Sequence, residues 1–386
     1  IMKSKSSDFI PLGAPTFGTD DINEVIDSLK SGWVGTGPKV GQFEQDFGNY
    51  VGSQSSLATN SCTAALHLSL MSIGLKPGDE VITTPMTFCA TVNTIIHAGG
   101  KPILADCNKE DFCIDPEKVS EKITKNTKAI LPVHFAGHSC DMENIMQLAN
   151  DHSLNVIEDC AHAIETTYED KHAGTFGDFG CFSFYATKNL VTGEGGMLIA
   201  KDEEKLHQIK KIALHGMSLD AWDRFSEGGF KHYDVVAPGF KYNMTDIQAA
   251  LGIHQLARIE ENWLKRQKIW KLYSESFSDL PIDLPSNEAK LNSKHAHHLY
   301  TILIRDDAPV NRDEFILRMQ ENNIGTGVHY RSIPGFSYYQ DNFGWNPDDY
   351  PNSTSIGNRT VSIPLSPGLS ENDLDRIVDK VNSILK

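Results

Sequence analysis

A single lysine, Lys188, lies between an apolar run and a glycine-rich turn in the stretch SFYATKNLVTGEGGML, which covers residues 183–198. A lysine in such a loop is ordinarily a solvated surface charge. The alternative is covalent chemistry, because an amine kept out of water forms a Schiff base with a carbonyl compound. The residue types elsewhere in the chain favour the second interpretation.

Polar groups and one aromatic ring elsewhere in the chain could act together with this lysine. Asp159 ends the apolar run NVIED, where a carboxylate costs desolvation energy unless it is paired. The stretch TNSCT, residues 59–63, supplies hydroxyls and an expected helix N-terminus, whose amides favour an anion such as phosphate. Ser183 adds a hydroxyl and Phe88 a flat aromatic face. An amine, an acid, an anion site and an aromatic plate are together what pyridoxal 5'-phosphate requires, since the acid keeps the cofactor's ring nitrogen protonated.

The candidate residues, and several others with reactive side chains, can also be explained by a purely structural role. Asp159 suits a helix cap or an ion pair, and His162 suits a hydrogen-bonded interior histidine. Asn243 precedes an expected helix and suits a local turn, while Phe88 suits ordinary core. Three cysteines are typical of small buried apolar residues rather than nucleophiles: Cys62, Cys89 and Cys160.

The elements that must position these groups follow from the pattern of residues 54–200. Short apolar runs alternate there with helical patterns, which predicts an α/β fold with a mostly parallel sheet covered by helices. Ligands gather beyond the carboxyl ends of such strands, where TNSCT, PMTFC, HFAGH and EDCAHA are expected. Neither GxGxxG nor GxxxxGK[ST] occurs, which disfavours a Rossmann dinucleotide site and a P-loop.

Helix signals divide the rest of the chain. Asp115 followed by Pro116 predicts one helix start, and Thr245 with Gln248 has the spacing of a capping box. Apolar residues at helical spacing from Leu256 to Phe277 predict a long connecting helix. We therefore expect a large domain over residues 1–252, then the connecting helix and a smaller α+β domain over 253–386.

The composition of the chain indicates which kinds of partner and which cellular compartment to expect. The chain has 386 residues and a formal net charge of -16, which argues against nucleic acid and anionic membranes. Seven cysteines without a CxxC pair predict neither disulfides nor a metal site and suit a reducing cytoplasm. The first residues predict no signal peptide, and no apolar stretch is long enough for a membrane span. A cytoplasmic protein is expected.

Several motifs resemble those of the DegT/DnrJ/EryC1/StrS family of sugar aminotransferases. These enzymes share the aspartate-aminotransferase-like fold, fold type I of the pyridoxal-phosphate enzymes. The resemblance covers nearly the whole length and rests on the stretches SGWVGTGPKVGQFEQDF, TNSCTAALHLSL, GDEVITTPMTFCATVN, VIEDCAHA, SFYATKNLVTGEGGML, PGFKYNMTDIQAALG, NIGTGVHYR and SIPLSPGLSENDLDRI.

The resemblance implies roles around the cofactor. Lys188 would form the Schiff base, Asp159 would bind the pyridine nitrogen, and His162 would lie by the ring's phenolic edge. Phe88, where the family often has tryptophan, would stack on the ring. The residues implied for the phosphate are Cys62, Thr63 and Ser183.

The same resemblance implies a partner subunit. Asn243 matches an asparagine that reaches the phosphate from the neighbouring subunit, so a homodimer with active sites at the subunit interface is expected. Lys241 would assist from that subunit. His329 and Arg331 lie where the family's sugar-nucleotide contacts cluster, and a guanidinium suits a pyrophosphate. A solvated surface charge is the alternative for Arg331.

The implied reaction transfers an amino group from L-glutamate to a keto sugar. The stretch HGMSLDAWDRFSEGGFKHYDVVAPGFKYN resembles members that aminate C-4 of UDP- or dTDP-linked 4-keto sugars, including the UDP-4-amino-4-deoxy-L-arabinose synthases. A C-3 aminotransferase, a dehydratase and a non-catalytic regulatory member remain alternatives. Lys188 counts against the dehydratases, in which histidine replaces this lysine. A desulfurase would need an exposed cysteine in a mobile loop, and the spacing suggests none.

Overall fold

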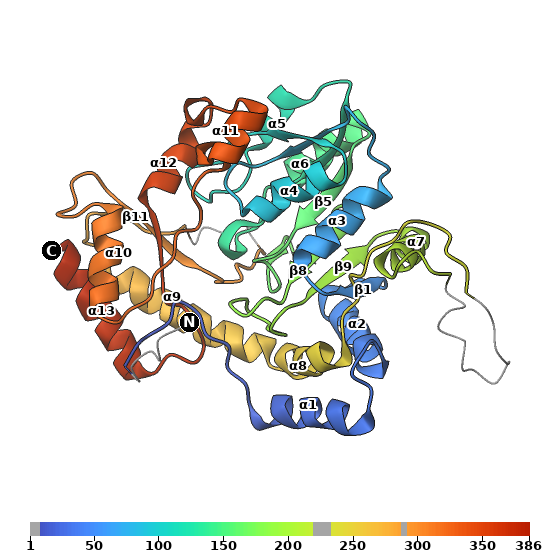
Figure 1. Cartoon of the computed structure of the whole chain (residues 1–386). Coiled ribbons are helices and arrows are strands. Elements are labelled where there is room, and N and C mark those ends of the chain that lie inside the picture. The colour runs from blue at the N-terminus through green and yellow to red at the C-terminus, as the bar shows by residue number, and fades with distance from the viewer. Residues whose placement is uncertain (1–7, 219–232, 287–291) are drawn as a thin grey trace.

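A seven-stranded sheet forms the centre of the computed structural model, which describes residues 8–218, 233–286 and 292–386 (Figure 1). The strand order is β1-β9-β8-β5-β4-β2-β3. Only β9 runs antiparallel to its neighbours in this sheet, and the remaining pairs are parallel. The predicted mostly parallel sheet is confirmed. Its strands are β1 (Ser56–Thr59), β2 (Glu80–Thr83), β3 (Lys101–Leu104), β4 (Thr127–Leu131), β5 (Asn155–Asp159), β8 (Phe179–Ser183) and β9 (Gly196–Ala200).

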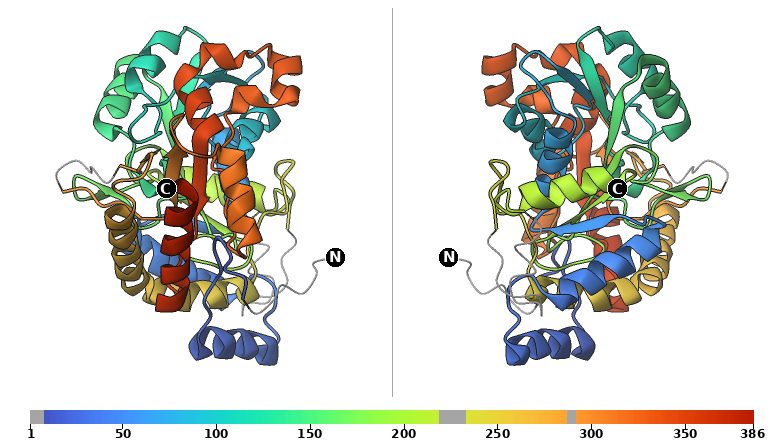
Figure 2. Two further views of the ribbon diagram at one scale, coloured as in Figure 1. Left: turned by 90° about the vertical axis from the view of Figure 1, so that its left-hand side faces the viewer. Right: turned by 90° about the vertical axis from the view of Figure 1, so that its right-hand side faces the viewer.

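Helices cover both faces of this sheet (Figure 2). Side chains alternate between the faces of a strand, so Val81 and Ile157 enter one apolar layer while Ile82 and Val156 enter another. The first layer contains residues of α3 (Cys62–Ser72), α4 (Cys89–His97) and α7 (Glu203–Ala213). The opposite face is covered by α2 (Pro38–Val51), α5 (Pro116–Lys122), α6 (Met142–His152) and α8 (Asp246–Ala257).

The helix starts follow the local signals in the sequence. Asp115 caps α5 by accepting a hydrogen bond from the Glu117 amide at 2.8 Å. Thr245 and Gln248 form the predicted capping box of α8. Since such caps satisfy amide groups that the first helical turn leaves unpaired, these positions are fixed by local chemistry.

The predicted connecting helix is present, and it begins at Ile259, three residues after Leu256, because a separate helix precedes it. α8 ends at Ala257, and Arg258 has φ −112° and ψ 15°, outside the helical range. The longer helix α9 (Ile259–Ser276) begins after it. The Arg258 guanidinium bonds to the His254 carbonyl and to Asp21, so polar contacts hold the bend that the apolar periodicity did not reveal.

A second, three-stranded antiparallel sheet lies in the C-terminal third of the chain. It has the order β10 (Ile282–Asp283), β11 (Tyr300–Ile304) and β12 (Thr360–Ile363). Its apolar core includes residues of α9, α10 (Arg312–Glu321) and α13 (Glu371–Leu385), together with Ile10 from the N-terminal segment. The domain boundary at 252/253 stays a prediction.

The remaining short elements connect the larger ones. They are β6 (Thr167–Tyr168), β7 (Lys171–His172), η1 (Phe135–Gly137), η4 (Ile333–Gly335), α11 (Ser337–Phe343), η5 (Pro347–Asp349) and α12 (Pro351–Arg359).

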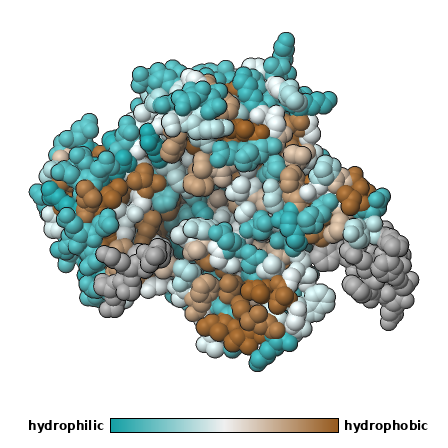
Figure 3. Space-filling model, in the orientation of Figure 1, coloured by the Kyte–Doolittle hydropathy of each residue, from teal (hydrophilic) through white to brown (hydrophobic). Residues whose placement is uncertain are grey.

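One helix carries an apolar face outward. α1 (Thr19–Ser31) contacts α8, and its far side forms an apolar patch on the surface (Figures 1 and 3). We call it the α1 patch; its exposed members are Ile22, Ile26, Leu29, Trp33 and Val34. Among the described residues, no helix has the length and apolar character needed to cross a membrane.

Candidate active site

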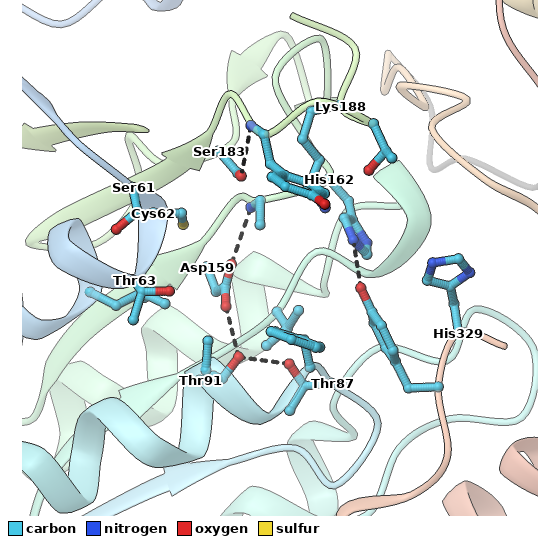
Figure 4. Close-up of a pocket in the computed structure, with 18 of the residues that line it drawn as sticks. Ser61, Cys62, Thr63, Thr87, Thr91, Asp159, His162, Ser183, Lys188 and His329 are labelled. Atoms are coloured by element: carbon cyan, nitrogen blue, oxygen red, sulfur yellow. Dashed lines mark hydrogen bonds between the residues drawn. The ribbon is translucent and has the colours of Figure 1, made fainter. Parts of the chain in front are cut away.

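A cavity of about 480 Å³ opens at the carboxyl edge of the central sheet (Figure 4). Asp159 and Ser183 are the last residues of β5 and β8, and Lys188 follows in the β8–β9 loop. The carboxyl ends of parallel strands meet at one edge, so residues distant in sequence converge here. The sequence-predicted residues that line this cavity are Cys62, Thr63, Phe88, Asp159, His162, Ser183, Lys188 and His329.

Lys188 points into this cavity (Figure 4). Its backbone amide bonds to the Tyr185 carbonyl at 2.8 Å, which closes a turn beneath the side chain. Loss of contact with water lowers the pKa of the amine to about 8, although nearby Cys62 and Asp159 oppose the shift. An amine with this pKa is unprotonated more often near neutral pH than an ordinary lysine, and only the unprotonated amine is a nucleophile.

Asp159 is held by two hydrogen bonds. The Thr91 hydroxyl donates to one carboxylate oxygen at 2.8 Å, and the Ala161 amide donates to the other at 3.1 Å (Figure 4). Thr91 in turn accepts from the Thr87 hydroxyl at 2.7 Å, because its own proton is committed to Asp159. Burial raises the pKa of the Asp159 carboxyl, and the two donors partly offset that effect. The carboxylate is thus oriented, with acceptor capacity left for a cation in the cavity.

His162 has a defined tautomer. Burial lowers its pKa well below the usual range, so the ring is neutral. The Ala136 amide donates to Nδ1 at 3.1 Å, and the ring proton therefore lies on Nε2, which donates to the Tyr330 hydroxyl at 3.0 Å. Burial raises the pKa of the Tyr330 phenol, which keeps its own proton and can donate it to another group. The pair supplies a neutral hydrogen-bond donor at the cavity wall.

The first turn of α3 forms the anion-binding end of the cavity. Ser61 caps the helix by accepting from the Ala64 amide at 3.1 Å, and Cys62 and Thr63 begin the turn. A helix N-terminus presents unpaired amides and partial positive charge, which suit a phosphate. A Cβ added to Gly196 of β9 would lie 2.6 Å from the Cys62 amide nitrogen, so only glycine allows β9 this close to the turn.

An exposed aromatic ring and a histidine complete the wall. The Phe88 side chain is 58% exposed at the start of α4, which contradicts an ordinary core role and leaves its ring open to the cavity. His329 bonds to the Ser362 hydroxyl at 2.9 Å. Burial lowers the pKa of His329 to about 4, helped by the charge of Lys188.

Three predicted site residues do not line the cavity of their own chain. Asn243 donates to the Thr36 hydroxyl at 2.6 Å and accepts from the Lys241 amine at 2.6 Å. Arg331 bonds to the Gly335 carbonyl and lies over the Phe336 ring. Their predicted roles, in a partner's site or at the sugar nucleotide, stay predictions. In the stretch from His215 to Asn243 that resembles C-4 aminating enzymes, residues 219–232 lie outside the described residues.

The sequence did not single out four residues at the cavity. Thr87 and Thr91 hold Asp159, and they stand four residues apart across the start of α4, a spacing that places two hydroxyls on one side. Ser61 is the N-cap of α3, and a serine directly before an apolar helical pattern could have predicted this cap. Tyr330 is contributed by a distant segment, and nothing in its local pattern connects it to His162.

These geometric features together define a class of enzyme. An amine with a lowered pKa, an oriented carboxylate and an amide-lined turn face one cavity, and each matches a different group of pyridoxal 5'-phosphate: the aldehyde, the ring nitrogen and the phosphate. The residues present therefore fit that cofactor.

The chain belongs to the DegT/DnrJ/EryC1/StrS aminotransferase family, whose model matches residues 15–382. It is thus a pyridoxal phosphate-dependent sugar aminotransferase of fold type I, and the expected family, fold and cofactor are confirmed.

Similar proteins span the full length of the chain. SpsC of Bacillus subtilis, a spore coat polysaccharide biosynthesis protein, is 46% identical over 100% of this chain and 99% of its own. Spr1654 of Streptococcus pneumoniae, described as a sugar aminotransferase, is 31% identical in its PMP-form, with a TM-score of 0.91 and 97% of both chains covered. A PLP-form of it is 30% identical, with a TM-score of 0.90 over 98% of this chain and 100% of that one. PseC of Helicobacter pylori, an aminotransferase involved in the biosynthesis of pseudoaminic acid, is 27% identical, with a TM-score of 0.90 over 98% and 99% of the chains.

Proposed function

We propose that this enzyme transfers the amino group of L-glutamate to the C-4 keto group of a UDP- or dTDP-linked sugar, giving an amino sugar and 2-oxoglutarate. The observation that carries the proposal is the Lys188 amine, with its pKa lowered to about 8, in one cavity with Asp159. Similarity to SpsC, a spore coat polysaccharide biosynthesis protein, and to Spr1654, described as a sugar aminotransferase, supports a sugar acceptor.

The cofactor, when bound, supplies an aldehyde for the migrating amino group and a ring that stabilises negative charge. Asp159 would pair with the protonated ring nitrogen of that cofactor, and Thr91 keeps the carboxylate in place. The Lys188 amine takes the proton from Cα of the amino donor, for which a pKa near the working pH is suitable. Tyr330, whose hydroxyl accepts from His162, keeps its own proton and would offer it as a hydrogen-bond donor to a bound ligand.

The dimer belongs to the same proposal. Isolated monomers rarely expose a contiguous apolar patch such as the α1 patch, and such surfaces commonly mark protein interfaces. Asn243 bonds to Thr36, which lies just beyond Val34 of that patch. We propose that a second copy covers the α1 patch and that Asn243 and Lys241 then reach the partner's cavity.

The acceptor is tested by supplying a panel of UDP-, dTDP- and GDP-linked 4-keto and 3-keto sugars with glutamate. Mass spectrometry of the product is expected to show amination of a 4-keto sugar linked to UDP or dTDP and formation of 2-oxoglutarate. Amination only of 3-keto sugars would contradict the C-4 assignment. Loss of water from the sugar without consumption of glutamate would contradict an aminotransferase.

A further inference from the structure

A buried polar network lies behind the wall of the catalytic cavity, next to Lys188. Its members are Glu165, Asn189 and His298, and all three side chains are buried. None of the three lines the cavity, so none is placed to touch a molecule bound there. Asn189 directly follows Lys188 in the chain, and whatever fixes the Asn189 side chain therefore also restrains the backbone that carries the lysine.

The Asn189 amide is bonded through both its nitrogen and its oxygen. Nδ2 donates to the two carboxylate oxygens of Glu165 at 3.0 and 2.9 Å, and to the Ala296 carbonyl at 3.0 Å. Oδ1 can only accept, so Nδ1 of His298 is the donor in the 2.9 Å bond between them. A buried amide with all these partners has one favourable position, because any displacement would leave several buried polar groups unpaired.

The turn that carries Lys188 has few other attachments. Phe184 and Asn189 are buried, whereas the four residues between them are exposed or half-buried. Phe184 is held by apolar packing on the near side of the turn. The hydrogen bond from the Lys188 amide to the Tyr185 carbonyl lies within the turn and does not attach it to the rest of the protein. Asn189 thus supplies the polar anchor on the far side.

The segment that receives this anchor is itself held in place. The Ala296 amide donates to the Gly137 carbonyl at 3.0 Å, and the His298 amide donates to the Ala136 carbonyl at 3.1 Å. The same Ala136 residue donates its amide proton to His162. One backbone segment therefore supports both the turn of Lys188 and the ring of His162.

We infer that Asn189 is a positioning residue for Lys188: held by Glu165 and His298, it fixes the turn so that the lysine amine stays inside the cavity. This inference rests on the proposed role of Lys188 and is independent of the identity of the acceptor sugar.

The charges of the network suit this role. Burial raises the pKa of the Glu165 carboxyl to about 7, while the positive charge of Arg266 and the Asn189 amide counteract the shift. Burial also lowers the pKa of His298 well below its usual range, so the ring is neutral. A neutral His298 can lie 4.5 Å from the ring of His162 without adding a positive charge near Lys188.

The reactivity of Lys188 in the cofactor-free full chain tests the inference. Competitive labelling with acetic anhydride over about pH 6–11, read by mass spectrometry, gives the midpoint at which the amine loses its proton. Wild type is expected to have a midpoint near pH 8. In Asn189→Ala the amine reaches water more readily, so we expect a midpoint higher by at least about one pH unit.

The groups that face the amine stay the same in this variant, so the midpoint reports the position of Lys188. They are Asp159, Cys62, His162, His298 and His329. Asn352→Ala is the matched control, because it removes a half-buried amide that donates to the Cys107 carbonyl at 2.8 Å, away from the cavity. Its midpoint is expected to equal that of wild type.

An unchanged midpoint in folded Asn189→Ala, or equal shifts in both variants, would overturn the inference. A wild-type midpoint near that of an ordinary lysine would instead contradict the role of Lys188 itself, so the two failures can be told apart. Circular dichroism establishes that each variant is folded.

Hydrogen exchange of the cofactor-free wild type tests the anchor even where Asn189→Ala fails to fold. The amides of residues 188–190 are expected to exchange at least about tenfold more slowly than in an unfolded chain. Exchange at the unfolded rate would show that the turn is not fixed and would overturn the inference.

Discussion

Lys188 and Asp159 lose contact with water at the same cavity, and burial acts on both by disfavouring their charged forms. It lowers the pKa of the lysine to about 8 and raises the pKa of the aspartate. The hydrogen bonds from Thr91 and Ala161 counteract the second shift and keep Asp159 able to pair with a cationic ring nitrogen. The surroundings of the cavity thus favour an unprotonated amine at Lys188 and an oriented carboxylate at Asp159.

The pH dependence of cofactor loading follows from the lysine. With a pKa of about 8, the unprotonated fraction of Lys188 rises from about a tenth at pH 7 to about nine tenths at pH 9. The rate at which cofactor-free enzyme takes up pyridoxal phosphate is therefore expected to increase through this range, with a midpoint near pH 8. Stopped-flow absorbance measures it. A rate that still rises steeply between pH 9 and pH 10.5 would indicate an ordinary lysine.

Thr91 is expected to act through Asp159. In Thr91→Val the carboxylate loses a buried donor, and a hydrogen bond to a charged group is worth about 1.5–3 kcal/mol. We expect kcat to fall by about tenfold or more with little change in KM for glutamate. Thr94→Val, which alters a buried threonine one turn along the same helix, is the control. Equal losses in the two variants would show that α4 packing, not Asp159, is responsible.

At the level of elements, the cavity depends on the close contact between β9 and the first turn of α3. Gly196 makes this contact possible, since a Cβ there would lie 2.5 Å from the Ser61 carbonyl carbon. With a larger residue at position 196, the first turn of α3 would have to move away from β9, and its amides would no longer face the cavity in the same way.

Gly196→Ala is expected to harm both stability and cofactor binding. Overpacking costs about 1–3 kcal/mol, and displacement of the turn should weaken binding of pyridoxal phosphate. Chemical denaturation and equilibrium binding measure the two effects. Gly41→Ala, on the exposed side of α2 with no atom near its added Cβ, is the control and should be neutral or slightly stabilising. Unchanged cofactor affinity in Gly196→Ala would contradict the role given to this turn.

The sequence predicted elements where the signal was local. The caps of α5 and α8 and the strand end at Asp159 each depend on residues a few positions apart. The bend at Arg258 was missed because it is held by Asp21, far away in the chain. Tyr330 was missed for the same reason, since only the folded chain brings it to His162.

At the scale of the whole molecule, the structure leaves the α1 patch uncovered and leaves Asn243 and Lys241 outside the cavity. The sequence resemblance supplied the expectation that these two residues serve a partner subunit. Local pattern alone could not have done so, because an intersubunit contact leaves no periodic signal within one chain.

The double variant Ile22→Glu/Leu29→Glu is expected to prevent dimerisation. It places two charges on the α1 patch, at positions 53% and 56% exposed, so folding of the monomer should be little affected. Sedimentation velocity should show a monomer, with loss of activity because the partner's residues are absent. Leu317→Glu, at an equally exposed leucine on α10, is the control and should leave the dimer intact. A double variant that stays dimeric would show that the interface lies elsewhere.

The attachment point of the cofactor is the most direct test of the whole account. The purified enzyme is treated with borohydride, digested and examined by mass spectrometry for a lysine that carries the reduced cofactor. The account predicts the modification at Lys188 and its disappearance in Lys188→Ala. A modification at another lysine, or none in an enzyme that still transfers amino groups, would contradict it.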